Sequence, residues 1–398
     1  MCDNVCTGNL SCSAGTCRCA DPTPGTAVRL TNSIADESRP RLAWDGSSHV
    51  GVAYLNTSYP AVNARFTLLG TDGSVTTDIP LTDFSTSGQV SNGPVIAWGG
   101  SEYGLAWVQR DNVGRTSVMF RRVSAAGAAI APAVQIGIGD DAAEAPYTNY
   151  HTGLGIAWSA SYGGYALSYR DDLNVSYLVF RRIGATGEAP EPQTKIALKG
   201  SYVQDFPMAA GPAGTWGVVG PDVSLSLFDA NGAHTIPTAL LNAGVQPLLV
   251  HDGKTWLTAF LYEPSTENLG TYWVNRGASA NSPSRLITAS TTAEHLDASI
   301  AMVNGALAIA FTNSPSSQYK TGPYGFSVQR FAIPSSTGST LTAIDRAVDV
   351  LASPSIPQRG DMQIIASGQY SLLAVWADNR SSTSRELYAR PIDLHTCP

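Results

Sequence analysis

Short runs of hydrophobic residues, each of strand length and separated by glycine or polar turns, repeat along the whole chain. The clearest copy spans residues 94–127 and reads PVIAWGG, SEYGLAWVQR and TSVMFRRVSAAG, which predicts a three-stranded antiparallel meander. The other copies start near Pro40, Gly153, Pro207, Pro247, Ala298 and Met362. A unit of this kind repeated seven times indicates a repeat protein.

A fourth apolar-polar stretch follows each of the first six copies, as at Ala133–Ile138, Gln193–Leu198 and Ser284–Thr288. The seventh copy lacks such a stretch, but a spare strand, Ala27–Thr31, precedes the first copy. A ring closed by the two ends of the chain removes an exposed sheet edge. The sequence therefore predicts an all-β fold, a seven-bladed β-propeller of four-stranded antiparallel blades whose last blade is closed by the N-terminal strand 27–31.

Several recurrent residues fit structural roles in such blades. Prolines stand at the start of first strands, where a missing N–H group is tolerated. Tryptophans within strands are expected to fill the core between blades. Of each arginine pair, Arg121-Arg122 and Arg181-Arg182, we expect one side chain to bridge to a neighbouring blade and the other to be solvated, because adjacent residues of a strand point to opposite faces.

Cysteines divide the chain into a Cys-rich segment, 1–20, and the propeller, 21–398. The six cysteines are Cys2, Cys6, Cys12, Cys17, Cys19 and Cys397. An even number of cysteines, mostly in one short segment, favours disulfides and an oxidising compartment. Zinc is disfavoured because no histidine is near and no paired CxxC spacing occurs.

The spacing of Cys12, Cys17 and Cys19 resembles the latter part of an epidermal-growth-factor-like module. This resemblance implies the pairs Cys2 with Cys12, Cys6 with Cys17, and Cys19 with Cys397. Closure of the ring independently favours the last pair, since the two ends of the chain must lie side by side in the last blade.

Residues 96–127 and 372–390 resemble the divergent propeller repeats of secreted bacterial proteins. The resemblance implies a fold and brings no catalytic residue with it. The chain lacks the S-x-D-x-G-x-x-W box of sialidase-type propellers and the paired Gly-His and Trp-Asp dipeptides of WD repeats. It also lacks the G-x-S-x-G elbow of serine hydrolases and the HExxH helix of zinc proteases.

Charge and hydropathy narrow the classes of possible binding partner. The formal net charge is −7 and no cluster of lysine and arginine occurs, which argues against nucleic acid and anionic membranes. No apolar run reaches the length of a membrane span, and no signal peptide is visible. We expect a monomer that is secreted or on the cell surface. Cys2 could alternatively be the acylated cysteine of a lipoprotein.

Binding residues of a propeller are expected at the channel mouth, on the segments that lead into first strands and on the connections between second and third strands. The candidates are Arg39, Arg110, Tyr147, Tyr150, His151, Arg170, Tyr202, Asp205, His295, Asp297, Tyr319 and Arg380. Tyrosine beside amide and charged groups suits a sugar, because the ring covers its apolar face and polar groups take its hydroxyls.

Two classes of function remain. The first is a binding or adhesion module for a glycan or an extracellular protein. The second is a glycoside hydrolase or polysaccharide lyase, with His151 or His295, Tyr150 and Arg170 as its first candidates. No cofactor is indicated; Asp205 and Asp297 could supply oxygen ligands to Ca²⁺, but no ligand loop of known spacing is present.

Overall fold

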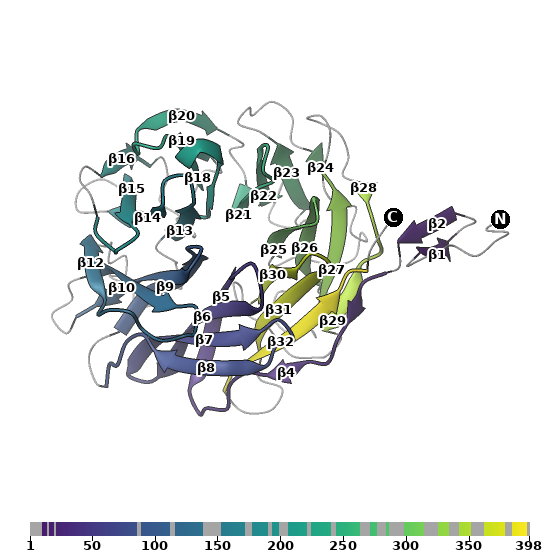
Figure 1. The fold of residues 1–398 in the computed structure, drawn as a ribbon, viewed down its shortest axis with the longest axis horizontal. Coiled ribbons are helices and arrows are strands. Elements are labelled where there is room, and N and C mark those ends of the chain that lie inside the picture. Colours follow the sequence, from purple (N-terminus) through teal and green to yellow (C-terminus); the bar gives the residue numbers. More distant parts are fainter. Residues whose placement is uncertain are drawn as a thin grey trace.

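The computed structural model shows strands arranged around a ring (Figure 1). It describes residues 10–13, 16–19, 21–85, 89–111, 116–137, 153–171, 177–189, 193–198, 206–220, 224–239, 244–262, 271–276, 284–285, 298–313, 325–333, 342–351, 362–378 and 384–395. In these ranges the one helical element is a 3-10 turn at Pro212–Gly214. None of their helices is long and apolar enough to cross a membrane.

Two four-stranded antiparallel units, which we call the first and second blades, join in one eight-stranded sheet through a single parallel bridge between Val62 and Gln89. The strands of the first blade are β5 (Asp36–Trp44), β6 (His49–Ser58), β7 (Ala61–Gly70) and β8 (Val75–Pro80). Those of the second are β9 (Gln89–Trp98), β10 (Glu102–Arg110), β11 (Thr116–Ser124) and β12 (Val134–Gly137).

Four further sheets continue the ring in chain order. The third blade contains β13 (Leu154–Ser159), β14 (Gly164–Asp171), β15 (Tyr177–Gly184) and β16 (Thr194–Ala197). The next sheet contains β17 (Met208–Ala210), β18 (Trp216–Val219), β19 (Ser224–Phe228) and β20 (His234–Ala239). The sheet after it contains β21 (Gly244–His251), β22 (Trp256–Tyr262), β23 (Thr271–Arg276) and β24 (Ser284–Arg285). The last of the four contains β25 (Ala298–Val303), β26 (Ala306–Asn313), β27 (Gly325–Ala332), β28 (Thr342–Ala343) and β29 (Val348–Leu351).

The closing blade joins the two ends of the propeller. Its strands are β30 (Met362–Gly368), β31 (Ser371–Asp378) and β32 (Glu386–Asp393), with β3 (Thr23–Pro24) and β4 (Val28–Arg29) from the N-terminal end. Both short strands pair antiparallel with β32: Thr23 lies opposite Asp393, and Val28 lies opposite Ala389. The predicted closure by residues 27–31 is confirmed, with a shorter strand there and an additional one at Thr23–Pro24.

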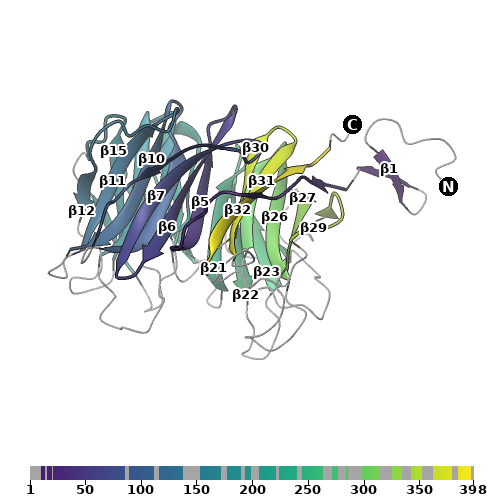
Figure 2. The ribbon, with the colours of Figure 1, turned by 90° about the horizontal axis from the view of Figure 1, so that it is seen from below.

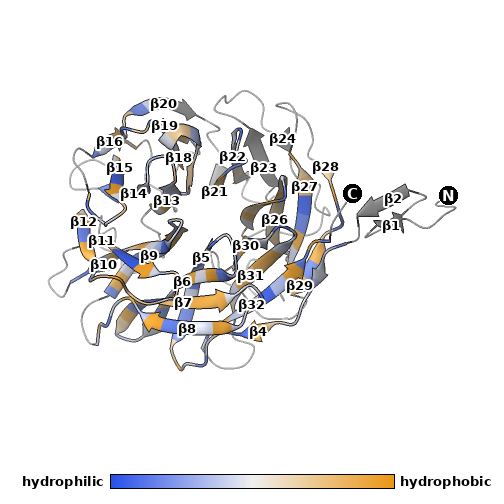
Figure 3. Cartoon of the chain, in the orientation of Figure 1, coloured by the Kyte–Doolittle hydropathy of each residue, from blue (hydrophilic) through white to orange (hydrophobic). Residues whose placement is uncertain are grey.

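These sheets confirm the predicted β-propeller of four-stranded antiparallel blades, while the blade number of seven stays a prediction. Seen from the side, the strands run between the two faces of the ring (Figure 2). Hydrophobic residues, orange in Figure 3, lie along the strands. Trp107, Trp216 and Trp376 are among the largest fully buried side chains, as expected for core filling between sheets.

The arginine pairs differ from the prediction, because both members of each pair bridge blades. Arg121 Nη1 donates to the carbonyl of Leu81 in the blade before, at 3.0 Å, and Arg122 Nη1 donates to Ala185 in the blade after, at 2.8 Å. Arg181 donates to the carbonyl of Ile136 in the blade before, and Arg182 donates to that of Ala230 in the following sheet at 3.0 Å. Since each blade has neighbours on both faces, side chains pointing in opposite directions both find a carbonyl.

Candidate functional site

The two faces of the ring are built differently. On one, which we call the far face, tight turns join first to second strands: Asp45 Oδ1 accepts the Ser47 N–H at 2.7 Å, and Asp252 Oδ1 accepts the Lys254 N–H at 2.7 Å. On the other, which we call the mouth face, first strands begin and second strands end. Fourth strands also end there, and long stretches of sequence separate some of them from the next first strand, such as the 16 residues between β12 and β13. A rigid ring with longer segments on one face is a common basis for a binding surface.

Arg39 stands at the mouth end of β5 in a conformation unusual for its type. It is half-buried and has a φ of 54°, and the register of β5 with β6 shifts around Arg39 and Pro40. The first strand of the second blade has the same irregularity, where Gly93 precedes Pro94 with a φ of 89°. Positive φ suits glycine and is strained for arginine. Strained backbone positions cluster at functional sites, which keeps Arg39 among the candidate residues.

Two other predicted site residues lie on the second strands of the next two blades, near the mouth ends of those strands. Arg110 ends β10, opposite Thr116, and Arg170 lies one residue from the end of β14, opposite Leu178. Together with Arg39, they place an arginine at the mouth end of three successive blades. The remaining candidates lie outside the described residues: Tyr147, Tyr150, His151, Tyr202, Asp205, His295, Asp297, Tyr319 and Arg380.

Beside Arg170, the third blade carries an ion pair at its mouth end. Lys195 Nζ lies 2.5 Å from Asp171 Oδ2 and 5.8 Å from the centre of the Tyr177 ring. The Lys195 side chain is 39% exposed, whereas Asp171 is buried. The pair leaves a cation and an aromatic ring next to each other at the mouth, a combination that can contact a polar ligand.

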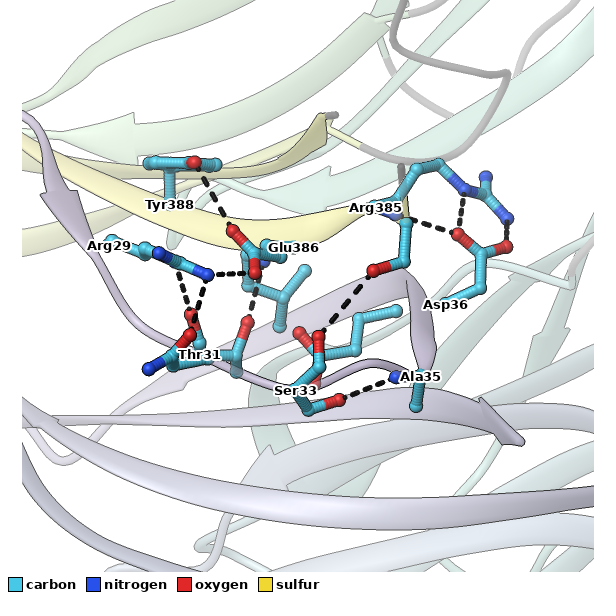
Figure 4. A network of polar contacts seen from close by, with 12 residues as sticks. Arg29, Thr31, Ser33, Ala35, Asp36, Arg385, Glu386 and Tyr388 are labelled. Atoms are coloured by element: carbon cyan, nitrogen blue, oxygen red, sulfur yellow. Dashed lines mark hydrogen bonds and ion pairs between the residues drawn. The ribbon is translucent and has the colours of Figure 1, made fainter. Parts of the chain in front are cut away.

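A network of polar contacts joins the closing blade to the first blade at the mouth face (Figure 4). Arg385 donates to both carboxylate oxygens of Asp36, with 2.8 Å from Nε to Oδ1 and 2.5 Å from Nη2 to Oδ2. Burial alone would raise the pKa of Asp36, but the hydrogen bonds and the charge of Arg385 outweigh it and hold this pKa below its ordinary value. Asp36 and Arg385 therefore form a charged clasp between the blades.

Glu37 lies directly behind that clasp and is only 1% exposed. Asn56 Nδ2 donates to Glu37 Oε1 at 3.3 Å, and the main-chain N–H of Glu37 donates to the carbonyl of Arg385 at 3.0 Å. Burial raises the pKa of Glu37, although the neighbouring side chains of Thr31, Asn56 and Ser33 favour its charged form. Glu37 thus contacts the N-terminal segment, the first blade and the closing blade at once.

Two more carboxylates, Asp378 and Glu386, are buried at the mouth end of the closing blade and lie opposite each other on β31 and β32. Each is held by donors of the protein itself. Trp376 Nε1 donates to Asp378 at 2.7 Å, while Arg29 forms an ion pair with Glu386, toward which the Tyr388 hydroxyl also points (Figure 4). These contacts give both carboxylates a structural role.

Two exposed hydrophobic side chains at the mouth face were not among the residues predicted from the sequence. Ile34 is 99% exposed just before β5, and Tyr59 is 96% exposed just after β6. Asp36 lies opposite Thr57 in the ladder of these strands, so continuing that register by two residues brings Ile34 level with Tyr59. No signal in the sequence distinguishes these residues from buried ones, because exposure depends on where the strands end.

Metal binding finds no support in the part of the chain that the structure describes. Within it, no three histidine, cysteine, aspartate or glutamate side chains gather in a group that could hold an ion. Asp205 and Asp297, the proposed Ca²⁺ ligands, lie outside it. Calcium binding stays a prediction.

Comparisons with known proteins support the fold. No family model and no curated protein sequence matches the chain. The solved structure of phage phi92 endosialidase is similar over 96% of this chain and 72% of its own, with a TM-score of 0.55 and 10% identity. A Dyadobacter fermentans protein of unknown function is similar over 94% of this chain and all of its own, with a TM-score of 0.53 and 10% identity. Raptor of Chaetomium thermophilum gives 0.52 and 11% identity over 95% of this chain but 29% of its own. At such identities the likeness shows a β-propeller fold and no shared activity.

Proposed function

We propose that this protein is a secreted or cell-surface binding or adhesion module that holds a glycan or an extracellular protein on its mouth face. The observation that carries the proposal is Arg39, a large cation kept at positive φ where the neighbouring blade has Gly93. The mouth positions of Arg110 and Arg170 and the exposed ring of Tyr59 support the same face.

Of the two ligand classes, a glycan fits these residues better. An exposed tyrosine ring can cover the apolar face of a sugar, while arginine and lysine side chains donate to its hydroxyl or carboxylate oxygens. The charged pair Lys195–Asp171 beside Tyr177 offers a second combination of this kind in the third blade.

Binding is favoured over catalysis by the state of the buried carboxylates that the structure describes. A glycoside hydrolase needs two carboxyl groups that face the substrate. Asp378 and Glu386 are instead engaged by Trp376 and Arg29, and Glu37 accepts a hydrogen bond from Asn56. The histidines and the tyrosine considered for a lyase, His151, His295 and Tyr150, lie outside the described residues, so a lyase is the alternative that the experiment must test.

The test is a glycan-array screen of the folded chain, with chromatography of any bound glycan after long incubation. We expect retention of a defined set of glycans with no change in their length. Conversion of a retained glycan into shorter or unsaturated products would show that the protein is an enzyme and contradict the proposed binding module. Absence of binding to every arrayed glycan, with retention of an extracellular protein, would overturn the glycan assignment.

A further inference from the structure

The Cys-rich segment contains a small hairpin that stands beside the ring, clear of the blades (Figures 1 and 2). Its strands are β1 (Leu10–Ser13) and β2 (Thr16–Cys19), and they pair only with each other. A two-stranded hairpin of this length is at best marginally stable in water. A covalent link within the hairpin would give it the stability that packing does not.

The register of the hairpin decides which cysteines such a link would join. Ser13 lies opposite Thr16, and Cys12 lies opposite Cys17. Two residues connect Ser13 to Thr16, so this pair flanks a tight turn and takes the hydrogen-bonded position of the ladder. Because hydrogen-bonded and non-hydrogen-bonded pairs alternate, Cys12 and Cys17 form a non-hydrogen-bonded pair, whose Cα atoms are typically about 4.5 Å apart. That separation falls within the range of disulfides.

We propose that Cys12 and Cys17 form a cross-strand disulfide that staples the hairpin. This pairing differs from the one implied by the epidermal-growth-factor-like spacing, which joins Cys12 to Cys2 and Cys17 to Cys6. The segment is then a stapled hairpin instead of an interlaced module.

The other cysteines follow from where the two ends of the chain lie. Thr23 pairs with Asp393, and the Thr23 hydroxyl lies 2.8 Å from His395 Nε2. Cys19 precedes Thr23 by four residues in the sequence and Cys397 follows His395 by two, so we keep the predicted pair Cys19 with Cys397. Cys2 and Cys6 are then left to pair with each other.

The bond forms by thiol–disulfide exchange with a small disulfide such as oxidised glutathione. One cysteine thiolate attacks the glutathione disulfide, forming a mixed disulfide and releasing one glutathione thiolate. The second cysteine, as its thiolate, attacks the protein sulfur of the mixed disulfide and releases the other glutathione. The two cysteines are thereby oxidised by two electrons, and one glutathione disulfide is reduced to two thiols.

Proteolysis of the full chain, after its free thiols are alkylated at acidic pH, tests the proposal. Trypsin cleaves after Arg18, between Cys17 and Cys19, and chymotrypsin cleaves after Leu10, between Cys6 and Cys12. We expect unreduced fragments 1–10 and 11–18 to separate, each lighter than its reduced form by two hydrogens. Recovery of the two fragments as one covalent species, or alkylation of Cys12 or Cys17, would overturn the proposal.

A variant gives an independent readout. In Cys12→Ser the proposed partner Cys17 becomes available, so one additional equivalent of iodoacetamide should be incorporated, at Cys17. In the control Cys2→Ser the new alkylated residue should be Cys6. If Cys12→Ser exposes Cys2 instead, the epidermal-growth-factor-like pairing is correct and the stapled hairpin is not.

Discussion

Arg39 and Gly93 occupy equivalent positions in neighbouring blades, each directly before a proline in a bulged first strand, and both have positive φ, 54° and 89°. The same backbone conformation is easy for glycine and strained for arginine. The two blades thus share the backbone conformation at this position, and they differ in that only the first blade has a side chain there.

Replacing Arg39 by glycine should separate stability from binding. Relief of the strained φ gains about 1–2 kcal/mol, and the greater freedom of glycine in the unfolded chain costs about 0.5–1 kcal/mol. We expect the free energy of unfolding, measured by urea denaturation, to stay the same or rise by up to about 1.5 kcal/mol, less the contribution of the contacts that Arg39 makes within the fold, while ligand binding falls at least tenfold.

The matched control is Gly93→Ala. Its Cβ would lie 3.2 Å from Leu154 Cδ2 and 3.3 Å from the Ala106 carbonyl, at a φ that alanine rarely adopts, so we expect a loss of about 1–3 kcal/mol. A comparable loss for Arg39→Gly would show that Arg39 serves the fold and not a ligand.

The buried carboxyl group of Glu37 should make stability depend on pH in an unusual direction. Its pKa is raised in the folded chain, so folding is penalised when the group is charged in both states, and the penalty disappears as pH falls through the folded pKa toward the ordinary value of 4.5. Glu37→Gln should therefore be more stable than the wild type at pH 7, by an amount on the order of 1 kcal/mol.

The measurement is the difference in unfolding free energy between Glu37→Gln and the wild type from pH 7 down to pH 4. Taking the difference cancels groups such as Asp36, whose lowered pKa acts in the opposite direction. The advantage of the variant should shrink as pH falls below the folded pKa of Glu37. A variant that is less stable than the wild type at pH 7 would mean that the carboxylate is needed in its charged form.

The ion pair of Arg29 with Glu386 ties the N-terminal strand to β32, and Glu386 is 1% exposed on its side chain. Arg29→Met leaves this buried carboxylate without its cation, and we expect a loss of about 1–3 kcal/mol, since Arg29 itself is partly exposed. Double replacement with Glu386→Leu should recover much of the loss. Hydrogen exchange of the Leu30 amide, which donates to Leu387 at 2.8 Å, reports on the same contact. Unchanged exchange in Arg29→Met would contradict the assigned role.

The architecture of the blades could be predicted because it depends on local patterns. Strands of alternating hydrophobicity and glycine turns are visible in the sequence, and the missing fourth strand of the last copy indicated closure by the N-terminal end. The prediction for the arginine pairs was incomplete, because it left one arginine of each pair in solvent. In a closed ring each blade has a neighbouring blade on both of its faces, and this arrangement is not visible in the sequence of a single strand.

The candidate site could be predicted only in outline. Arg39, Arg110 and Arg170 lie on strands near the ends that topology assigns to the mouth face, and their role in binding stays a prediction. The positive φ of Arg39 depends on a bulge in pairing with β6, and the exposure of Tyr59 depends on where that strand ends. Both are properties of tertiary structure that one sequence does not encode in a readable pattern.

The covalent closure predicted from the sequence, Cys19 with Cys397, has a measurable consequence for stability. The bond would close a loop spanning nearly the whole chain, for which chain entropy gives about 6 kcal/mol as an upper estimate. Replacing both cysteines by serine should lower the urea midpoint and leave ligand specificity unchanged. An unchanged midpoint in the double variant, or a free Cys397 thiol in the wild type, would rule out this bond.

The most direct test of the mouth face compares two variants, each with two exposed hydrophobic side chains removed. One is Ile34→Ser with Tyr59→Ala at the mouth; the other is Val75→Ser with Ile130→Ser, 44% and 43% exposed on segments that begin at the far face. All four side chains are exposed enough for both variants to keep the melting temperature of the wild type. Titration with a glycan retained by the wild type should show at least tenfold weaker binding for the mouth variant and unchanged binding for the far-face variant. The reverse result, weaker binding only for the far-face variant, would contradict a ligand site at the channel mouth.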